Sequence, residues 1–196
     1  MDCAKIGELI YNLRKEQGLT QKNIADKLNI SNKTVSKWER GLGCPDIALW
    51  NDLSEILNID ISQMMTGEIS LNKEDIGKLS RIRFYTCPNC KNILTSTGVA
   101  TIFCCGRKLD PLIPKKNEFV KVKINISDIE YYITTDHEMN RQAYILFAAY
   151  VKNDNVFIRR MYPEQSPNFR IPYTSGGKLY IYSTKFGFLN IDNGFN

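Results

Sequence analysis

The chain has 196 residues, a net charge of +5 and a 43% hydrophobic content that is typical of a folded protein. Its longest apolar run, residues 143–151, is about half of the ~18 residues that a membrane span needs, and the first ten residues lack the pattern of a secretory signal. These features exclude a membrane protein and predict a cytoplasmic one. In that compartment disulfides are rare, and clustered cysteines bind metals or take part in redox chemistry.

Apolar residues recur at helical spacing near the N-terminus, and the pattern predicts five short helices over residues 2–66. Thr20 and Ser31 are placed to cap the second and third helices. Gly18 and Gly41 are placed to end the first and third, because glycine readily adopts the left-handed conformation that closes a helix.

The third helix is expected at residues 32–40, with Val35 and Trp38 facing the core. The fourth helix is expected to bury the apolar residues that follow Pro45, namely Ile47, Leu49 or Trp50, Leu53, Ile56 and Leu57. The second and third helices are joined by a tight turn, and the outward side of the third is polar. This arrangement predicts a helix-turn-helix.

The stretch LTQKNIADKLNISNKTVSKWERG, residues 19–41, is similar to the XRE family of phage-repressor-like DNA-binding domains. The small Ala25 at the helix contact and the Glu39-Arg40-Gly41 ending belong to this pattern, and the resemblance extends over residues 4–66. It implies double-stranded DNA as a partner. It also implies a homodimer that reads two half-sites about 34 Å apart.

Carried over by position, the resemblance assigns seven residues to DNA. Three of them, Gln21, Ser36 and Arg40, are placed to contact phosphates. The other four lie on the major-groove face of the recognition helix: Asn32, Lys33, Thr34 and Lys37. Asparagine suits an adenine edge, lysine a guanine edge and the threonine methyl a thymine. A merely solvated cationic face is the alternative, because residues 1–67 carry eight Lys/Arg against nine Asp/Glu.

Residues 68–84 are mostly polar with a sparse apolar stripe. They predict a linker that is helical in part. A plain linker and a dimerisation segment remain open as alternatives.

Four of the six cysteines fall between residues 87 and 106. Cys87 and Cys90 form a C-x-x-C knuckle, whereas Cys104 and Cys105 are adjacent. Because neighbouring side chains on a strand point to opposite faces, these two sulfurs reach one ion only if the backbone turns sharply. Gly106 permits such a turn. Four thiolates suit tetrahedral zinc or iron. A catalytic thiol pair is the weaker alternative, and a disulfide between neighbours would be strained. The remaining two cysteines, Cys3 and Cys44, are expected to be ordinary thiols.

This knuckle resembles the desulforedoxin unit that begins desulfoferrodoxins, in which the ion is iron. From residue 119 onward the chain predicts about seven antiparallel strands in an immunoglobulin-like β-sandwich. The order of motifs there, from Asp136-His137-Glu138-Met139 to Phe186-Gly187-Phe188, resembles the superoxide reductase domain of the same family.

The resemblance also identifies where that family's iron ligands would lie. The family uses four histidines and one cysteine, whereas this chain has one histidine, His137. The other positions hold Phe119, Ala143, Ser183 and Phe186, none of which ligates iron. We therefore expect no superoxide reductase activity and no enzyme. His137 is expected to be structural or part of a remodelled pocket, and the former metal cavity to be packed shut or to bind a ligand or partner.

The predicted chain is thus α followed by β, in four parts. These are a helix-turn-helix domain (1–67), a linker (68–84), a four-cysteine knuckle (85–114) that binds one zinc or iron ion, and a β-sandwich (115–196). The predicted function is a DNA-binding transcriptional regulator with a structural or sensing metal site, responding to a small-molecule or protein effector. A redox protein or electron carrier and an antitoxin-type autoregulator are the alternatives.

Overall fold

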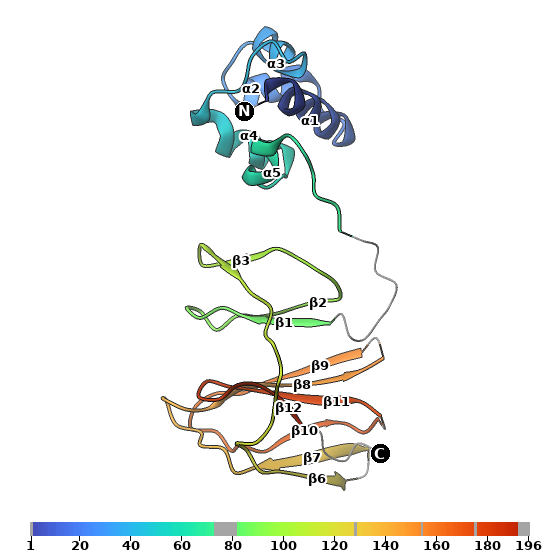
Figure 1. Cartoon of the computed structure of the whole chain (residues 1–196), viewed down its shortest axis with the longest axis vertical. Helices are drawn as coiled ribbons and strands as arrows, with labels where there is room; N and C mark the ends of the chain where they lie inside the picture. Colours follow the sequence, from blue (N-terminus) through green and yellow to red (C-terminus); the bar gives the residue numbers. More distant parts are fainter. Residues whose placement is uncertain (1, 73–81, 128, 154, 175, 192–196) are drawn as a thin grey trace. The chain divides into compact units, whose positions relative to one another are not determined.

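The computed structural model describes residues 2–72, 82–127, 129–153, 155–174 and 176–191. The chain divides into two compact units, residues 1–72 and 73–196. The first is helical and the second is rich in strands (Figure 1). Most of the predicted linker helix falls on residues 73–81, which lie outside the described residues.

The first unit contains the five predicted α-helices and one short 3-10 helix: α1 (Cys3–Glu16), α2 (Gln21–Lys27), α3 (Asn32–Glu39), η1 (Ile47–Leu49), α4 (Trp50–Leu57) and α5 (Ile61–Thr66). Thr20 and Ser31 cap α2 and α3 as expected. One core prediction is wrong, because Ile47 is 79% exposed. It lies in η1, before α4 begins, and is therefore out of phase with the buried side chains of α4, of which Trp50 is the first.

Helices α1 and α3 approach closely because residue 7 has no side chain. A methyl group on Gly7 would lie 1.9 Å from the carbonyl oxygen of Trp38, which is far inside van der Waals contact. The contact is continued by Ile6 and Ile10 of α1 and by Val35 of α3, all of which are almost completely buried. The recognition helix is therefore held along its inner side by α1.

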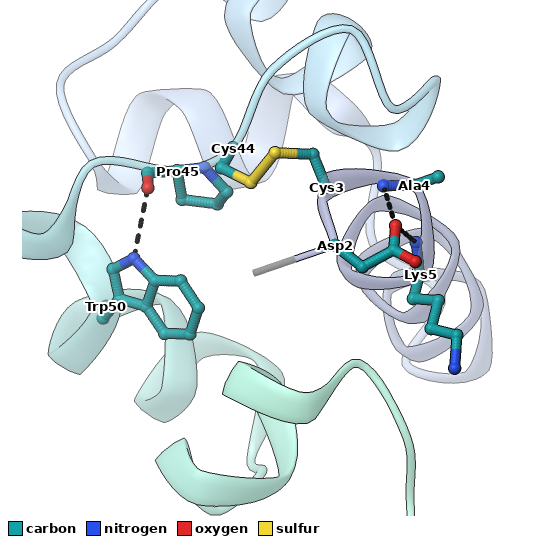
Figure 2. Close-up of a disulfide and its surroundings, with 7 residues drawn as sticks. All are labelled: Asp2, Cys3, Ala4, Lys5, Cys44, Pro45 and Trp50. Atoms are coloured by element: carbon teal, nitrogen blue, oxygen red, sulfur yellow. Dashed lines mark hydrogen bonds between the residues drawn. A yellow bond between two sulfur atoms is a disulfide. The ribbon is translucent and has the colours of Figure 1, made fainter.

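The two cysteines outside the knuckle form a disulfide, so the expectation of free thiols is wrong (Figure 2). Cys3 begins α1, and Cys44 lies in the loop after α3, with their Cα atoms 5.0 Å apart. The packing of α1 on α3 brings these positions together although 41 residues separate them in sequence. A residue pattern alone does not reveal this proximity.

We expect reduction of this disulfide to destabilise the first unit by roughly 2–4 kcal/mol, because the bond restricts the unfolded chain. Both tryptophans of the chain, Trp38 and Trp50, lie in this unit, so their fluorescence in urea reports its unfolding alone. A reductant should lower the urea midpoint of the wild type but not that of a Cys3→Ser/Cys44→Ser variant. Equal midpoints with and without reductant in the wild type would contradict the prediction.

The second unit begins with two hairpins and continues as two larger sheets (Figure 1). The first hairpin pairs β1 (Arg83–Thr86) with β2 (Ile93–Ser96), and the second pairs β3 (Ile102–Cys104) with β4 (Arg107–Leu109). The other strands are β5 (Lys115–Lys116), β6 (Val122–Ser127), β7 (Glu130–Thr135), β8 (Ile145–Lys152), β9 (Asn155–Arg160), β10 (Phe169–Pro172), β11 (Lys178–Ser183) and β12 (Gly187–Ile191). They form a three-stranded sheet, β10-β7-β6, and a five-stranded sheet, β5-β12-β11-β8-β9.

The central part of the five-stranded sheet is buried on both faces, whereas its edge strands β5 and β9 are mostly exposed. One face shares a core with the three-stranded sheet, through residues such as Tyr131, Ile133 and Ile181. The other face packs against the first hairpin, where Phe84 of β1 meets Phe147 and Phe188. Strand β8 is therefore buried at every position but its last, which explains its long apolar run.

The strand prediction is confirmed in outline, since a strand-rich region follows the helical one. The sequence pattern predicts strands at residues 131–134, 144–151, 156–160 and 179–183, and strands β7, β8, β9 and β11 fall within one or two residues of these segments. Strands β10 and β12 are not among the predicted segments. The immunoglobulin-like classification stays a prediction, as does the four-part division. Within the described residues, no helix has the length and apolar character needed to cross a membrane.

Candidate functional site

Helix α3, the predicted recognition helix, has a buried side and a cationic side. Val35 and Trp38 are 0% and 4% exposed, respectively. Lys33, Lys37 and Arg40 are all exposed, and they follow one another at spacings of four and three residues. At about 100° per residue, these three positions fall within a sector of roughly 60° opposite the buried pair. We call this row the α3 cationic stripe.

Two of the predicted DNA contacts, Thr34 and Arg40, also form hydrogen bonds within α3 or with its cap. Thr34 is half-buried, and its hydroxyl lies 2.8 Å from that of Ser31, the cap of the helix. Arg40 donates from Nε to the carbonyl of Ser36 at 3.1 Å, which directs its guanidinium along the helix and leaves its two terminal nitrogens for another partner. Asn32 is exposed at the first position of α3.

Gln21 was predicted to contact phosphate, but its side-chain amide donates to Glu39 at 2.7 Å. Glu39 in turn accepts from Nε and Nη2 of Arg14, at 2.5 and 2.8 Å. The Arg14 and Glu39 side chains are only 7% and 3% exposed, and their contact raises the pKa of Arg14. A buried ion pair thus ties α1, α2 and α3 together.

A concave surface of about 560 Å3 lies beside this network. It is lined by the last turn of α1, the start of α2 and the first residue of α3: Arg14, Lys15, Gly18, Leu19, Thr20, Gln21, Lys22 and Asn32. Two predicted DNA contacts, Gln21 and Asn32, therefore lie on one surface with further cations. Lys15 was missed by the sequence analysis, although its position in the basic last turn of α1 is a signal that could have found it.

The four knuckle cysteines converge in the second unit. Their sulfur atoms all lie within 4.8 Å of one another, and those of Cys90 and Cys104 are 3.5 Å apart. Cys87 is buried, Cys104 is half-buried, and Cys90 and Cys105 are exposed. Among the described residues, this is the one cluster of His, Cys, Asp or Glu side chains that is placed to hold a metal ion.

The adjacent cysteines converge because they lie in a two-residue hairpin turn. Cys104 pairs with Arg107, so Cys105 and Gly106 form the loop between β3 and β4. Their φ angles are 50° and 73°, as a type I′ turn requires. The predicted sharp turn at Gly106 is therefore confirmed, and it begins one residue earlier, at Cys105. This reversal brings two neighbouring sulfurs to the same side.

Three thiols of the cluster, those of Cys87, Cys104 and Cys105, differ in acidity. Backbone N–H groups of Cys90 and then Asn89 donate to the Cys87 sulfur and lower the pKa of that thiol to about 6, against the opposing effect of burial. Hydrogen bonds to the sulfurs of Cys90 and Cys87 raise the pKa of Cys105 to about 12. The hydrogen bond between the sulfurs of Cys104 and Cys90 likewise raises the pKa of Cys104. The cluster therefore stabilises the Cys87 thiolate and resists ionisation of Cys104 and Cys105.

A divalent ion fits this donor set. A tetrahedral ion with sulfur ligands at 2.3 Å needs sulfur–sulfur distances of about 3.8 Å, close to those of the cluster. The charge of the ion would also offset the repulsion that opposes ionisation of all four thiols. Cys87, Cys90, Cys104 and Cys105 can thus hold one metal ion, as predicted, and both zinc and iron accept such ligands.

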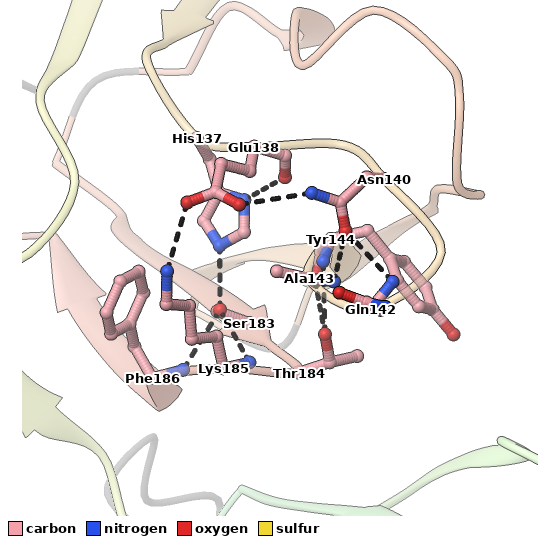
Figure 3. Close-up of polar contacts among 10 residues, drawn as sticks. All are labelled: His137, Glu138, Asn140, Gln142, Ala143, Tyr144, Ser183, Thr184, Lys185 and Phe186. Atoms are coloured by element: carbon pink, nitrogen blue, oxygen red, sulfur yellow. Dashed lines mark hydrogen bonds and ion pairs between the residues drawn. The ribbon is translucent and has the colours of Figure 1, made fainter.

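His137 is hydrogen-bonded through both ring nitrogens (Figure 3). Nδ1 faces the backbone carbonyl of Glu138, which only accepts, so Nδ1 carries the proton. Nε2 then accepts from the Ser183 hydroxyl at 2.7 Å. The Ser183 oxygen also accepts from the backbone N–H groups of Lys185 and Phe186, both at 3.1 Å. This buried pair is internally satisfied, which agrees with a structural histidine.

The structure brings together four of the five positions that the sequence analysis aligned with iron ligands. Besides the His137–Ser183 pair, Phe119 and Phe186 stack with ring centroids 5.0 Å apart, and the His137 ring meets Phe186 edge-on at 5.7 Å. Ala143, the fifth position, is buried and bonds through its backbone to Asn140. Aromatic rings and a hydroxyl therefore stand where the resemblance would place ligands.

Comparisons with known proteins match parts of this chain to regulators. Residues 10–64 match the family model described as Helix-turn-helix. The chain is 31% identical over 102 residues to the HTH-type transcriptional activator BcrR of Enterococcus faecalis, which covers 50% of this chain and 48% of that protein. It is 32% identical over 73 residues to the HTH-type transcriptional regulator ImmR of Bacillus subtilis, covering 37% and 53%.

Among solved structures, the superoxide reductase from Treponema pallidum aligns with a TM-score of 0.48 and 10% identity, over 57% of this chain and 98% of that one. The matched regions span about half the length of the curated relatives. The first unit is thus a helix-turn-helix domain, as the sequence predicted, and its relatives are transcriptional regulators.

Proposed function

We propose that this protein is a sequence-specific DNA-binding transcriptional regulator that acts as a homodimer in the cytoplasm. The observation that carries the proposal is the α3 cationic stripe: Lys33, Lys37 and Arg40 project from the outer side of a helix whose inner side is fixed by α1. Such a helix suits the major groove, where lysine side chains bond guanine edges and phosphates. The match of residues 10–64 to the helix-turn-helix family supports the same function.

In this proposal Asn32, Lys33, Thr34 and Lys37 face the bases, while Ser36 and Arg40 contact phosphates. The role of Gln21 is modified. Its amide donates to Glu39, so it is proposed to orient α2 against α3. Lys15 and Lys22, on the same concave surface, are proposed to contact phosphate in its place.

The first test is to remove two charges from the stripe. A consensus duplex is first selected from a random-sequence library with the full-length protein, and its affinity is measured by fluorescence anisotropy at 150 mM salt, roughly physiological ionic strength. Lys33→Ala/Lys37→Ala should weaken binding by at least about 30-fold, since each base or phosphate contact contributes on the order of 1–3 kcal/mol. Metal content should not change, because the cysteine cluster belongs to the other unit.

A matched control removes the same charge elsewhere. Lys121 and Lys123 are exposed in the second unit, so Lys121→Ala/Lys123→Ala separates local contacts from net charge. This variant should bind the consensus duplex within about threefold of the wild type. Retained affinity in the Lys33→Ala/Lys37→Ala protein, or an equal loss in both variants, would reject the assignment of α3 as the recognition helix.

We further propose that the four cysteines bind one zinc or iron ion with a structural or sensing role, and that the β region is not a superoxide reductase. The engagement of both His137 ring nitrogens supports the second statement, because neither is directed to a metal. A visible absorption band in the purified protein would indicate a ferric four-thiolate centre, whereas zinc is colourless. Consumption of superoxide well above the rate of a Ser183→Ala variant would contradict the non-enzymatic assignment.

A further inference from the structure

A cavity of about 430 Å3 lies in the second unit, between the first hairpin (β1 and β2) and the five-stranded sheet. Three parts of the chain line it. They are the start of β1 with Arg83 and Phe84, the segment 111–114, and the sheet residues Val151, Tyr180 and Phe188. Its size is within the range of small-molecule sites.

The walls of this cavity are apolar and held in place. The Phe84 ring lies 5.4 Å from that of Phe188 and 6.1 Å from that of Tyr180, measured between centroids. The Leu112 N–H donates to the Phe84 carbonyl at 2.7 Å, which fixes segment 111–114 against β1. Pro111 and Pro114 limit the backbone freedom of that segment. The cavity is therefore largely formed before any ligand arrives.

One cationic residue lines this apolar space. Arg83 is half-buried, and it is the one lining residue that carries a charge. No salt bridge links it to an acidic side chain within the described parts of the chain. A guanidinium in such a setting favours a planar anion, which it binds through two parallel hydrogen bonds.

We infer that this cavity binds a small aromatic or branched aliphatic carboxylate. The apolar body lies against Phe84 and Phe188, and the carboxylate pairs with Arg83. Because Phe84 is three residues before Cys87 in the same hairpin, the ligand also stabilises the segment that carries the first metal ligand. Binding there does not depend on whether the helical unit binds DNA.

The test uses two probes of equal shape, 2-naphthoate and its uncharged amide, 2-naphthamide. Titration calorimetry with the full-length protein should give a Kd below about 1 mM for naphthoate and an at least ~10-fold weaker one for naphthamide, since only the first pairs with Arg83. Arg83→Gln should lower naphthoate affinity to that of the amide and leave naphthamide binding unchanged. Equal affinity of the wild type for both probes, or no effect of Arg83→Gln, would overturn the role of Arg83.

A second variant tests the location without touching the core. Ile113 is 79% exposed and lines the cavity, so Ile113→Trp should fill part of it and weaken both probes at least ~10-fold. Ile129, 82% exposed and not among the lining residues, provides the matched control Ile129→Trp, which should bind as the wild type does. Unchanged binding in Ile113→Trp, or no binding of either probe to the wild type, would overturn the inferred site.

Discussion

Replacing Cys87 by serine is expected to abolish metal binding and to unfold the two hairpins that carry the cysteines. Cys87 is the one buried cysteine of the cluster, and its sulfur accepts backbone N–H groups that lower the pKa of the thiol, so its thiolate is well prepared as a ligand. The hairpins contain strands of only four and three residues, and two-stranded hairpins of this size are marginally stable in water.

Phe84 anchors β1 on the five-stranded sheet, but the small core around the cysteines cannot replace the ion. It consists of Tyr85, Cys87 and Leu109 with a few partly buried neighbours. A structural zinc contributes roughly 10–16 kcal/mol of binding free energy in small zinc-dependent folds, which is more than such a core provides. Loss of the ion should therefore expose the chain around Lys91 and Lys108 to trypsin.

The measurement is metal per chain by mass spectrometry, together with the sites of trypsin cleavage. Cys3→Ser/Cys44→Ser is the control, because it replaces cysteines by serine outside the cluster and leaves the cluster intact. It should retain one metal ion per chain and resist cleavage at the knuckle. Wild-type protein without stoichiometric metal, or a Cys87→Ser protein that retains it, would contradict a metal-binding knuckle.

The elements that were predicted well from the sequence are those governed by local rules. Helix caps at Thr20 and Ser31 depend on one side chain and a neighbouring backbone N–H, and both were predicted correctly. The sharp turn at Gly106 follows from the requirement that two adjacent cysteines reach one ion. The cluster of four cysteines could be predicted for the same reason, because residue type and spacing alone indicate a four-thiolate metal site.

What the sequence did not reveal depends on contacts between distant residues. Cys3 and Cys44 are joined only because α1 packs on α3 at Gly7, and Glu39 bonds Arg14 across 25 positions. The exposure of Ile47 depends on a single 3-10 turn that shifts the phase of the following helix. Side-chain periodicity carries no information on any of these.

The Arg14–Glu39 ion pair leads to the second large effect: Arg14→Met should destabilise the helical unit by about 3–5 kcal/mol. Methionine keeps the apolar length of arginine but leaves the Glu39 carboxylate, whose side chain is 3% exposed, without its cation. The carbonyl of Leu19 would also lose a donor, because Nη1 of Arg14 bonds it at 2.9 Å. Such a loss is a large part of the 5–15 kcal/mol that typically stabilises a domain.

A double variant separates the unpaired charge from the loss of packing. Arg14→Met/Glu39→Met removes both charges, and replacement of a buried pair by apolar residues is often close to neutral, so it should recover most of the stability. Trp38, next to Glu39 in sequence and buried in the same core, reports unfolding in urea by its fluorescence. The ion pair does not hold α1 and α3 together if Arg14→Met lowers the free energy of unfolding by less than about 1 kcal/mol, or if the double variant is no more stable than the single one. In either case the fixed position of the α3 cationic stripe must have another cause.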